Sequence, residues 1–327
     1  KKYGKIISFS LLIAFMKINT LTEDEVKHLK PAELVELLSI LISSEIANTY
    51  RPGEIKTVSV PRPINIKDGG EDGKIEFEIP DNDTRLDNSR WIKSKYTMFQ
   101  CKAQKMSDAV CYNEIVVVKK KSPKTLKPQV KKCFDKNGEY ILFTTDSMVD
   151  ATIENRVKSL RKGLKDTNTA DFDNKRIRIL DANQIATWAN EYIAAIIFVQ
   201  ACRGITRIGQ FSTWANWNTY YRAEKKYEYQ QSDILKDYTN KLIDLLETEK
   251  VVRIIGHKGL GKTRFVLESF NPKSPNANIK NLSDTVVYIN LATSDPKELA
   301  SFIINHSSLE GILIVDNCAN TRHVSYS

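Results

Sequence analysis

The chain has 327 residues, of which 41% are hydrophobic, so it is long enough to form two domains with packed cores. Its formal net charge of +9 indicates a polyanionic partner. Five cysteines without a C-x-x-C pair and four scattered histidines argue against a disulfide framework and a zinc site, and predict a reduced, cytoplasmic protein.

Residues 1–15 imitate a secretory signal, because Lys1-Lys2 precedes an apolar run from Ile6 to Phe15. That run is too short to span a membrane, and no small-x-small cleavage site comes after it. We expect residues 1–15 to be upstream translated sequence or a disordered extension. No other segment is a candidate membrane span, so no membrane partner is expected.

Residues 17–203 predict a first domain in which helices and strands mix. A capping box begins a helix at Thr22, and Pro31 opens a second helix with an apolar leucine stripe. Strands are expected at 55–60, 75–79, 96–101, 140–145 and 176–180, and helices near 150–164 and 182–198. This mixture predicts an α/β domain.

An acidic, glycine-rich turn, Asp68-Gly69-Gly70-Glu71-Asp72-Gly73, lies between two of these strands. Downstream, a hydrophobic strand ends in Gln100-Cys101-Lys102, and alternation along a strand turns Gln100 and Lys102 to the same face and Cys101 to the core. A carboxylate-bound Mg²⁺ polarises a scissile phosphate and activates water, while a lysine stabilises the developing charge. The spacing alone is equally compatible with an ordinary turn before a strand.

Two further features carry less functional weight. The basic stretch from Lys119 to Lys132 either contacts DNA phosphates or forms a solvated lysine-rich surface. Three tryptophans, Trp188, Trp214 and Trp217, are expected to pack in cores and not to stack on bases.

Residues 204–231 are rich in tyrosine and tryptophan and are expected to link the first domain to a second one, residues 232–327. A helix from about Ser232 to Glu249 leads into the segment 256–263, which fits the phosphate-binding pattern G-x-x-x-x-G-K-[ST]. A buried strand is expected at 251–255 and a helix after the motif, which disfavours a chance glycine-rich turn.

The motif contains the groups that bind a nucleotide. Gly256, Gly259 and Gly261 let backbone N–H groups turn toward phosphate oxygens. Lys262 is expected to contact the β- and γ-phosphates of ATP, and Thr263 to ligate Mg²⁺.

A second nucleotide-site element is expected at the end of the hydrophobic run 312–315. Asp316 comes directly after this run and is predicted to hold Mg²⁺ directly or through water. Asn317 stands where many hydrolysing ATPases carry a carboxylate, so ATP binding is better supported than hydrolysis. The chain ends soon afterwards, at Ser327, and we expect an incomplete P-loop NTPase α/β domain.

The segments 29–38, 68–73 and 99–102 together resemble the Mrr-type branch of PD-(D/E)xK nucleases, in which Gln replaces the usual acidic residue of the E-x-K half. The resemblance implies a restriction-endonuclease-like mixed sheet flanked by helices. By that pattern, Asp72 is the metal ligand, and the other two site residues are Gln100 and the catalytic Lys102.

The same resemblance implies a carboxylate from the leading helix. Glu33 is the expected residue, with Glu36 one turn further as the alternative. Asp68 is a possible auxiliary ligand but more typical of a residue that shapes the turn.

Segments 126–132, 140–145 and 182–190 resemble the later part of nuclease domains fused to STAND NTPases, so that residues 20–318 as a whole resemble Avs-type antiviral STAND proteins of bacteria and archaea, with an Mrr/Cap4-like nuclease in front. The resemblance implies that ATP-bound protein forms a homo-oligomer after a C-terminal sensor, outside this chain, recognises a viral protein. The clustered nuclease domains would then cut double-stranded DNA with Mg²⁺.

Two other functions stay open. One is an ATP-driven restriction or repair enzyme in which hydrolysis moves DNA, against which Asn317 argues. The other is a non-enzymatic nucleotide-binding scaffold whose nuclease-like domain binds DNA without cutting it.

Overall fold

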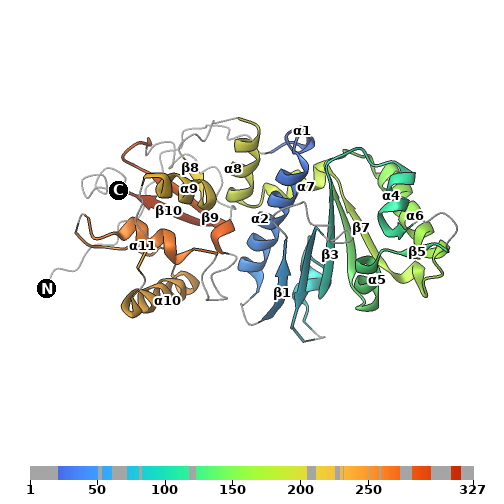
Figure 1. Ribbon diagram of the computed structural model, residues 1–327, viewed down its shortest axis with the longest axis horizontal. Coiled ribbons are helices and arrows are strands. Elements are labelled where there is room, and N and C mark those ends of the chain that lie inside the picture. Colours follow the sequence, from blue (N-terminus) through green and yellow to red (C-terminus); the bar gives the residue numbers. More distant parts are fainter. Residues whose placement is uncertain are drawn as a thin grey trace. The chain divides into compact units, whose positions relative to one another are not determined.

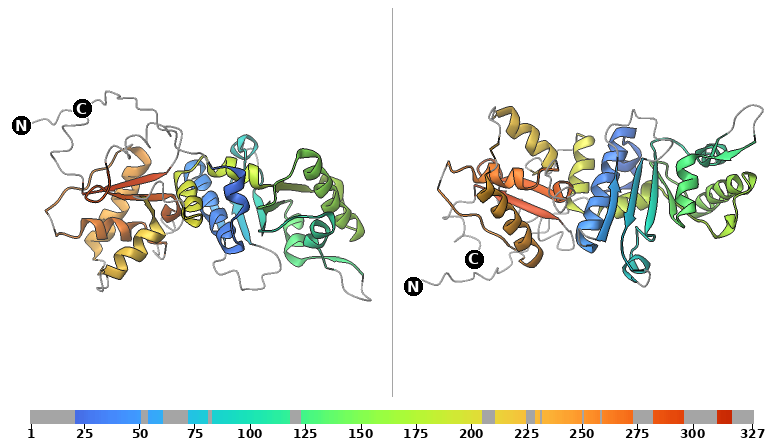
Figure 2. Two further views of the ribbon diagram at one scale, coloured as in Figure 1. Left: turned by 90° about the horizontal axis from the view of Figure 1, so that it is seen from above. Right: turned by 60° about the horizontal axis from the view of Figure 1, so that its bottom comes forward.

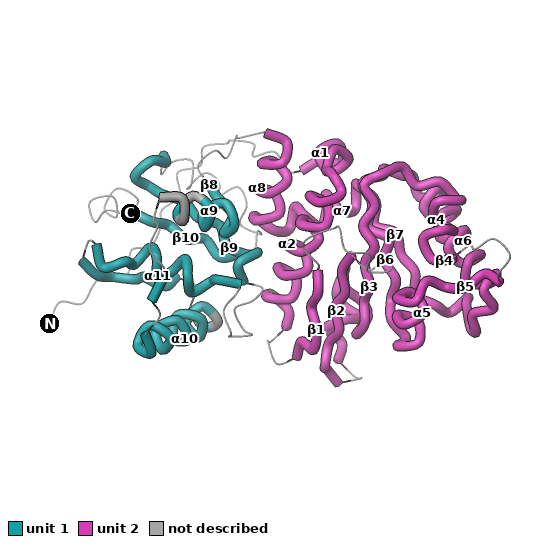
Figure 3. Tube along the Cα trace, viewed as in Figure 1, with its two compact units in different colours: residues 1–19, 208–327 teal, residues 20–207 magenta. Residues whose placement is uncertain are grey.

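The computed structural model describes residues 21–50, 54–60, 72–80, 83–117, 123–204, 211–224, 229–230, 232–249, 251–257, 259–272, 282–295 and 311–317. The chain divides into two compact units, one formed by residues 20–207 and the other by residues 208–327 together with 1–19 (Figure 3). The division between Arg207 and Ile208 lies inside the expected linker, 204–231.

The first unit is built on a five-stranded mixed sheet with the order β1-β2-β3-β6-β7 (Figure 1). The antiparallel part comprises β1 (Ile55–Ser59), β2 (Gly73–Phe77) and β3 (Tyr96–Lys102). The parallel part adds β6 (Glu139–Thr144) and β7 (Arg176–Leu180). Helices must connect the parallel strands, because such strands cannot be joined by a tight turn.

Helices cover both faces of this sheet (Figure 2). The crossover helices α4 (Asp108–Ile115), α5 (Pro128–Asp135) and α6 (Asp150–Asp166) cover one face. The other face packs against a second group of helices, α1 (Glu23–Lys27), α2 (Pro31–Thr49), α7 (Ala182–Ala189) and α8 (Ile193–Cys202). The short elements α3 (Arg85–Asn88), β4 (Val116–Val117), β5 (Thr125–Leu126) and the 3₁₀ turn Phe172–Asn174 complete the unit.

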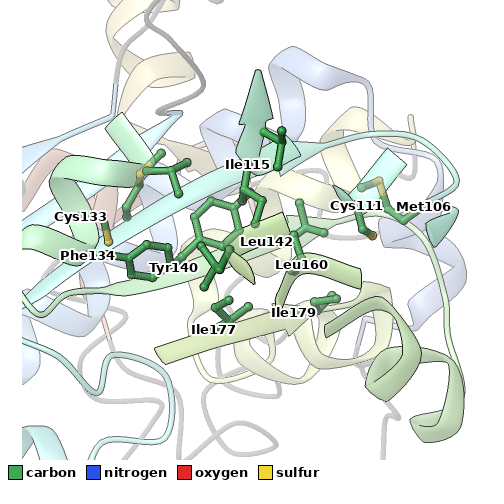
Figure 4. Packing of buried hydrophobic residues seen from close by; sticks show 14 of the residues in the cluster. Met106, Cys111, Ile115, Cys133, Phe134, Tyr140, Leu142, Leu160, Ile177 and Ile179 are labelled. Atoms are coloured by element: carbon green, nitrogen blue, oxygen red, sulfur yellow. The ribbon is translucent and has the colours of Figure 1, made fainter. Parts of the chain in front are cut away.

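The alternation of side chains along the strands divides the core into two layers. Met98, Tyr140 and Leu142 join the cluster under α4, α5 and α6 (Figure 4). Phe99 and Phe143 point the other way, to the buried ring of Trp188 in α7. Every residue of β6 is buried, as expected for a parallel strand covered on both faces.

The helix expected over 182–198 is in fact two helices, α7 and α8. The break falls at Asn190, whose side chain accepts a hydrogen bond from the Leu21 backbone N–H (2.7 Å) and donates one to the Leu21 carbonyl (2.9 Å). A local pattern does not reveal this tie because its partner is 169 residues away.

The second unit contains a three-stranded sheet with the order β10-β9-β8. β9 (Val286–Asn290) pairs in parallel with β10 (Ile312–Asp316) and antiparallel with β8 (Phe211–Thr213). The described helices beside this sheet are α9 (Trp214–Glu224), α10 (Asp233–Thr248) and α11 (Lys262–Ser269), together with the 3₁₀ turn Leu282–Thr285. The fold of the chain is therefore mixed α/β, as predicted.

The strand expected at 251–255 is not formed. These residues join no strand ladder among the described elements, and the side chains of Val251 and Ile255 are 84% and 83% exposed. An apolar, β-branched run favours a strand only where a neighbouring strand supplies hydrogen bonds and a core covers its side chains. Here the run 251–255 joins no ladder among the described residues, and of its residues only Val252 packs partly against the core of the second unit.

The tryptophans and cysteines agree only in part with the expected packing. Trp188, Trp214 and Trp217 are all buried, which confirms that they are core residues. Cys101, expected in the core, is partly exposed. The cysteines that the structure describes are all free thiols, and Cys318 lies outside the described residues. None of the described helices has both the length and the apolar character needed to cross a membrane.

Candidate active site and nucleotide-binding loop

Three residues singled out in the first unit meet at the carboxyl end of β3. The Asp72 N–H donates to the Phe99 carbonyl (3.1 Å), and Asp72 Oδ2 accepts from the Cys101 N–H (2.8 Å). The β2–β3 register pairs Gly73 with Phe99 and Lys74 with Met98, which places Asp72 opposite Gln100. Asp72 and the Gln-x-Lys strand end are therefore neighbours.

Gln100 is buried, with 2% of its surface exposed, and both ends of its amide are bonded. Its Oε1 accepts from the Tyr140 hydroxyl (2.8 Å), and its Nε2 donates to Glu114 Oε2 (2.8 Å). Burial, and then the negative charge of Glu114, raises the pKa of Tyr140 well above its ordinary value. Tyr140 is therefore a protonated donor, and the orientation of the Gln100 amide is determined by its two partners.

Glu114, in the last turn of α4, is the site residue that sequence reasoning missed. Its carboxylate binds the Lys102 ammonium through Oε1 (3.0 Å) and the Lys127 ammonium through Oε2 (3.2 Å). A usable signal exists in the sequence, because Glu114 lies beside Ile115 and one turn after Cys111, both buried residues of the same short helix. A carboxylate on a buried helix face requires partners.

Lys127, which the sequence presents only as part of a basic stretch, belongs to this cluster. Its ammonium shares Glu114 with Lys102, so the two lysines and one carboxylate leave one positive charge in a half-buried position. Other lysines of the stretch are paired elsewhere, Lys124 with Asp166 and Lys131 with Asp135. Residues 118–122 lie outside the described part of the chain.

The leading helix α2 does not supply the expected carboxylate. Glu33 accepts a hydrogen bond from the Lys30 N–H (2.8 Å) and so caps its own helix. The pKa of Cys202 is raised to about 11 by burial and then by the negative charges of Glu33 and Glu36, which places both carboxylates near α8. Within the described contacts, neither reaches Asp72, Gln100 or Lys102, and Glu114 stands in their place.

The physical reason is the face on which α2 packs. A Cβ atom added at Gly73 would lie 3.0 Å from Leu38 Cδ2 and 3.6 Å from Phe99 Cβ, so α2 rests on the Phe99 face of the sheet. Gln100 and Lys102 point to the opposite face, toward α4. α4 therefore supplies the carboxylate.

A cation at this site would rely on Asp72. In the described ranges, no group of three or more His, Cys, Asp or Glu side chains is arranged to hold a metal ion. Asp68 and Glu71 lie outside the described residues. Of the two described carboxylates beside the Gln-x-Lys strand end, Glu114 is engaged by Lys102 and Lys127, so the fit to a metal rests on Asp72.

The second unit brings the phosphate-binding motif onto the start of α11. Gly259 and Gly261 have φ of +85° and +77°, a region that favours glycine, and no atom lies within 4 Å of a Cβ placed at either. The ammonium of Lys262 donates to the carbonyls of Gly256 and His257, at 2.8 Å each. The lysine thus lies over its own loop, a position from which it can reach a phosphate.

Thr263 and Asp316, which are 53 residues apart, are in contact at the same end of the parallel strands. The Thr263 hydroxyl donates to Asp316 Oδ2 (2.9 Å), and the Asn317 N–H donates to Asp316 Oδ1 (2.8 Å). All six residues assigned to nucleotide binding therefore lie on one loop, the start of its helix and the end of β10. This donor set fits a Mg²⁺–nucleotide complex.

Comparison with known proteins adds nothing to this geometry: the chain matched no protein family, no curated protein and no solved structure.

Proposed function

We propose that the protein is a Mg²⁺-dependent DNA endonuclease of PD-(D/E)xK type, controlled by an ATP-binding P-loop module. One observation carries the proposal. The Asp72 carboxylate accepts a hydrogen bond from the backbone of Cys101, between Gln100 and Lys102, so Asp72 lies beside the Gln-x-Lys strand end.

The order of elements supports a restriction-endonuclease-like core. A helix, α2, precedes the antiparallel strands β1 to β3, and crossover helices then lead to β6, which is parallel to β3. In this order, the start of β2, next to Asp72, and the end of β3, which carries Lys102, lie at the same end of the sheet. It is the arrangement that the resemblance to Mrr-like nucleases implies.

The chemistry divides among few groups. Asp72 would hold Mg²⁺, which when bound would polarise the scissile phosphate and make a bound water more acidic. Lys102 stabilises the charge that develops on the phosphate, and its position is determined by Glu114. The positive charge left at Lys102 and Lys127 attracts the DNA backbone.

ATP has its own proposed site in the second unit. Lys262 contacts its phosphates, while Thr263 and Asp316 hold its Mg²⁺. The resemblance to antiviral STAND proteins supports control by assembly: ATP-bound copies form a homo-oligomer that cuts double-stranded DNA, and recognition of a viral protein promotes this assembly.

A second candidate is a nucleotide-binding scaffold that binds DNA without cutting it. It is favoured by the engagement of both Gln100 and Lys102 with Glu114, which leaves Asp72 as the other described carboxylate beside them, and by the lack of a three-ligand metal group among the described residues.

Cleavage of supercoiled plasmid with ATP and either Mg²⁺ or EDTA separates the two candidates. We expect the protein to cut only with Mg²⁺, and Lys102→Ala to lower the rate about 100-fold or more while plasmid binding is retained. Lys131→Ala is the matched control, because Lys131 is exposed and paired with Asp135. Undiminished cutting by Lys102→Ala would refute the site, and binding without any cutting would favour the scaffold.

A further inference from the structure

Asp316 has a third hydrogen-bond donor that the phosphate-binding motif does not include. The Tyr288 hydroxyl, from the middle of β9, lies 3.1 Å from Asp316 Oδ2, the same oxygen that accepts from Thr263. The other oxygen, Oδ1, accepts from the Asn317 N–H. The carboxylate is thus held by a donor from each of three segments.

Tyr288 is itself held in place by an aromatic stack. Its ring lies 4.2 Å from that of Trp217, with an interplanar angle of 6°. Trp217 is buried in the core of the second unit and belongs to α9. Since the stacked ring cannot swing away without opening that core, the hydroxyl is positioned before any ligand arrives.

We propose that Tyr288 is a positioning residue of the Mg²⁺–nucleotide site, which orients Asp316 toward the cation shared with Thr263. The proposal rests on the proposed binding of ATP. A carboxylate held by Thr263 and its own neighbour alone could turn about its side-chain bonds, whereas a hydrogen bond from Tyr288 fixes the rotamer. Partners that orient metal ligands in this way typically change metal affinity about 10- to 100-fold.

The stack also extends the site to α9. Trp217 touches Tyr288, and the Trp214 indole N–H donates to the Leu267 carbonyl in α11, the helix that starts at Lys262. α9 therefore contacts both Tyr288, which bonds to Asp316, and α11, which begins at Lys262. Binding of Mg²⁺–ATP should accordingly change the fluorescence of these tryptophans.

The test is a Mg²⁺ titration of the intact chain at a fixed concentration of a fluorescent ATP analogue, followed by tryptophan fluorescence and by analogue anisotropy. We expect Tyr288→Phe to raise the Mg²⁺ concentration at half-saturation about tenfold, with analogue binding in EDTA unchanged. Tyr221→Phe is the matched control. It removes a phenol hydroxyl from the same core, and the Tyr221 ring packs on Arg264 and not on Asp316.

Each outcome has a separate meaning. Wild-type Mg²⁺ dependence in Tyr288→Phe would overturn the proposal. We expect Lys262→Ala to lose binding of the ATP analogue while the wild type binds it. Failure of the wild type to bind the analogue would overturn the ATP site itself. If Tyr288→Phe also lowers thermal stability, a double-mutant cycle with Asp316→Asn separates the two effects. In the Asp316→Asn background, Tyr288→Phe must no longer change the Mg²⁺ concentration at half-saturation. An additive effect of the two substitutions on this concentration would refute a role of Tyr288 through Asp316.

Discussion

At the scale of single residues, the candidate site of the first unit is organised around the buried carboxylate of Glu114. Glu114 is 8% exposed and serves Gln100, Lys102 and Lys127 at once. Gln100 and Lys102 could be predicted as neighbours from strand alternation, because that rule acts within a few residues. Glu114 is 14 residues from Gln100 and on another element, so its role is decided only by the packing of α4.

Removal of Glu114 should expose how much the two lysines depend on it. We expect Glu114→Ala to lower the free energy of unfolding by about 3 kcal/mol, because a buried ion pair that loses one partner leaves an uncompensated charge. Urea unfolding followed by circular dichroism measures the change. Asp135→Ala is the control: its carboxylate is exposed and binds Lys131 at 2.7 Å, so a loss below about 1 kcal/mol is expected. Equal losses would contradict the proposed role of Glu114.

The buried thiols and a buried tyrosine phenol predict that the folded state loses stability at alkaline pH. Burial raises the pKa of Cys111 from 9.0 to about 11, and raises that of Tyr140 well above 10.0. The folded state therefore keeps protons that the unfolded chain loses, so stability is full below pH 9 and falls between pH 9 and 11. Unfolding midpoints measured from about pH 8 to 11 check this. Cys111→Ala should flatten the decline, and an unchanged slope would argue against the shift.

At the scale of elements, whether a strand forms where the local sequence predicts one depends on burial. The continuous apolar run at 140–145 predicts a strand, and β6 forms there because helices cover both of its faces. Residues 251–255 have a similar run but join no ladder in the described structure, only Val252 of the run packs partly against a core, and they do not form a strand. Local hydrophobicity is necessary for a buried strand, and neighbouring elements decide whether it forms.

Trp188 of α7 supports β3 on the Phe99 face of the sheet, opposite the face that carries Gln100. Its ring stacks near Trp91 (5.4 Å) and Phe99 (6.5 Å) and meets Phe143 edge-on. We expect Trp188→Ala to cost about 3 to 5 kcal/mol of folding free energy, as for other large-to-small core changes. Denaturant unfolding provides the measurement. Val149→Ala, at a side chain that is 70% exposed, should cost less than about 0.5 kcal/mol. A small loss at Trp188 would show that the core can collapse around the gap.

At the scale of the whole molecule, the net charge of +9 favours contact with a polyanion but does not identify the surface. The division into residues 20–207 and a unit that begins at 208 separates two sites. The proposed cleavage residues lie in the first unit, and the nucleotide residues in the second. The chain passes from the first unit to the second between Arg207 and Ile208, and α9, which begins at Trp214, already belongs to the second unit.

Salt dependence of DNA binding tests the contribution of Lys127 to this charge. Affinity for a short duplex, measured by anisotropy over a range of salt concentrations, should fall linearly on a log–log plot. Lys127→Ala should weaken binding and reduce the slope by roughly one counterion, because one phosphate contact is lost. Lys131→Ala should have a smaller effect, since Lys131 is engaged with Asp135. An identical slope for Lys127→Ala and wild type would place the DNA elsewhere.

The sequence by itself determined the features that depend on spacing: the glycine-rich loop before α11 that fits the phosphate-binding pattern, the Gln-x-Lys strand end and the acidic residue that closes β10. Only the tertiary structure decided that α4 and not α2 supplies the buried carboxylate, that Lys127 joins Lys102, and that Tyr288 holds Asp316. Motif positions are encoded within a few residues of one another. The face on which a helix packs, and therefore which side chains meet, depends on the fit between distant surfaces.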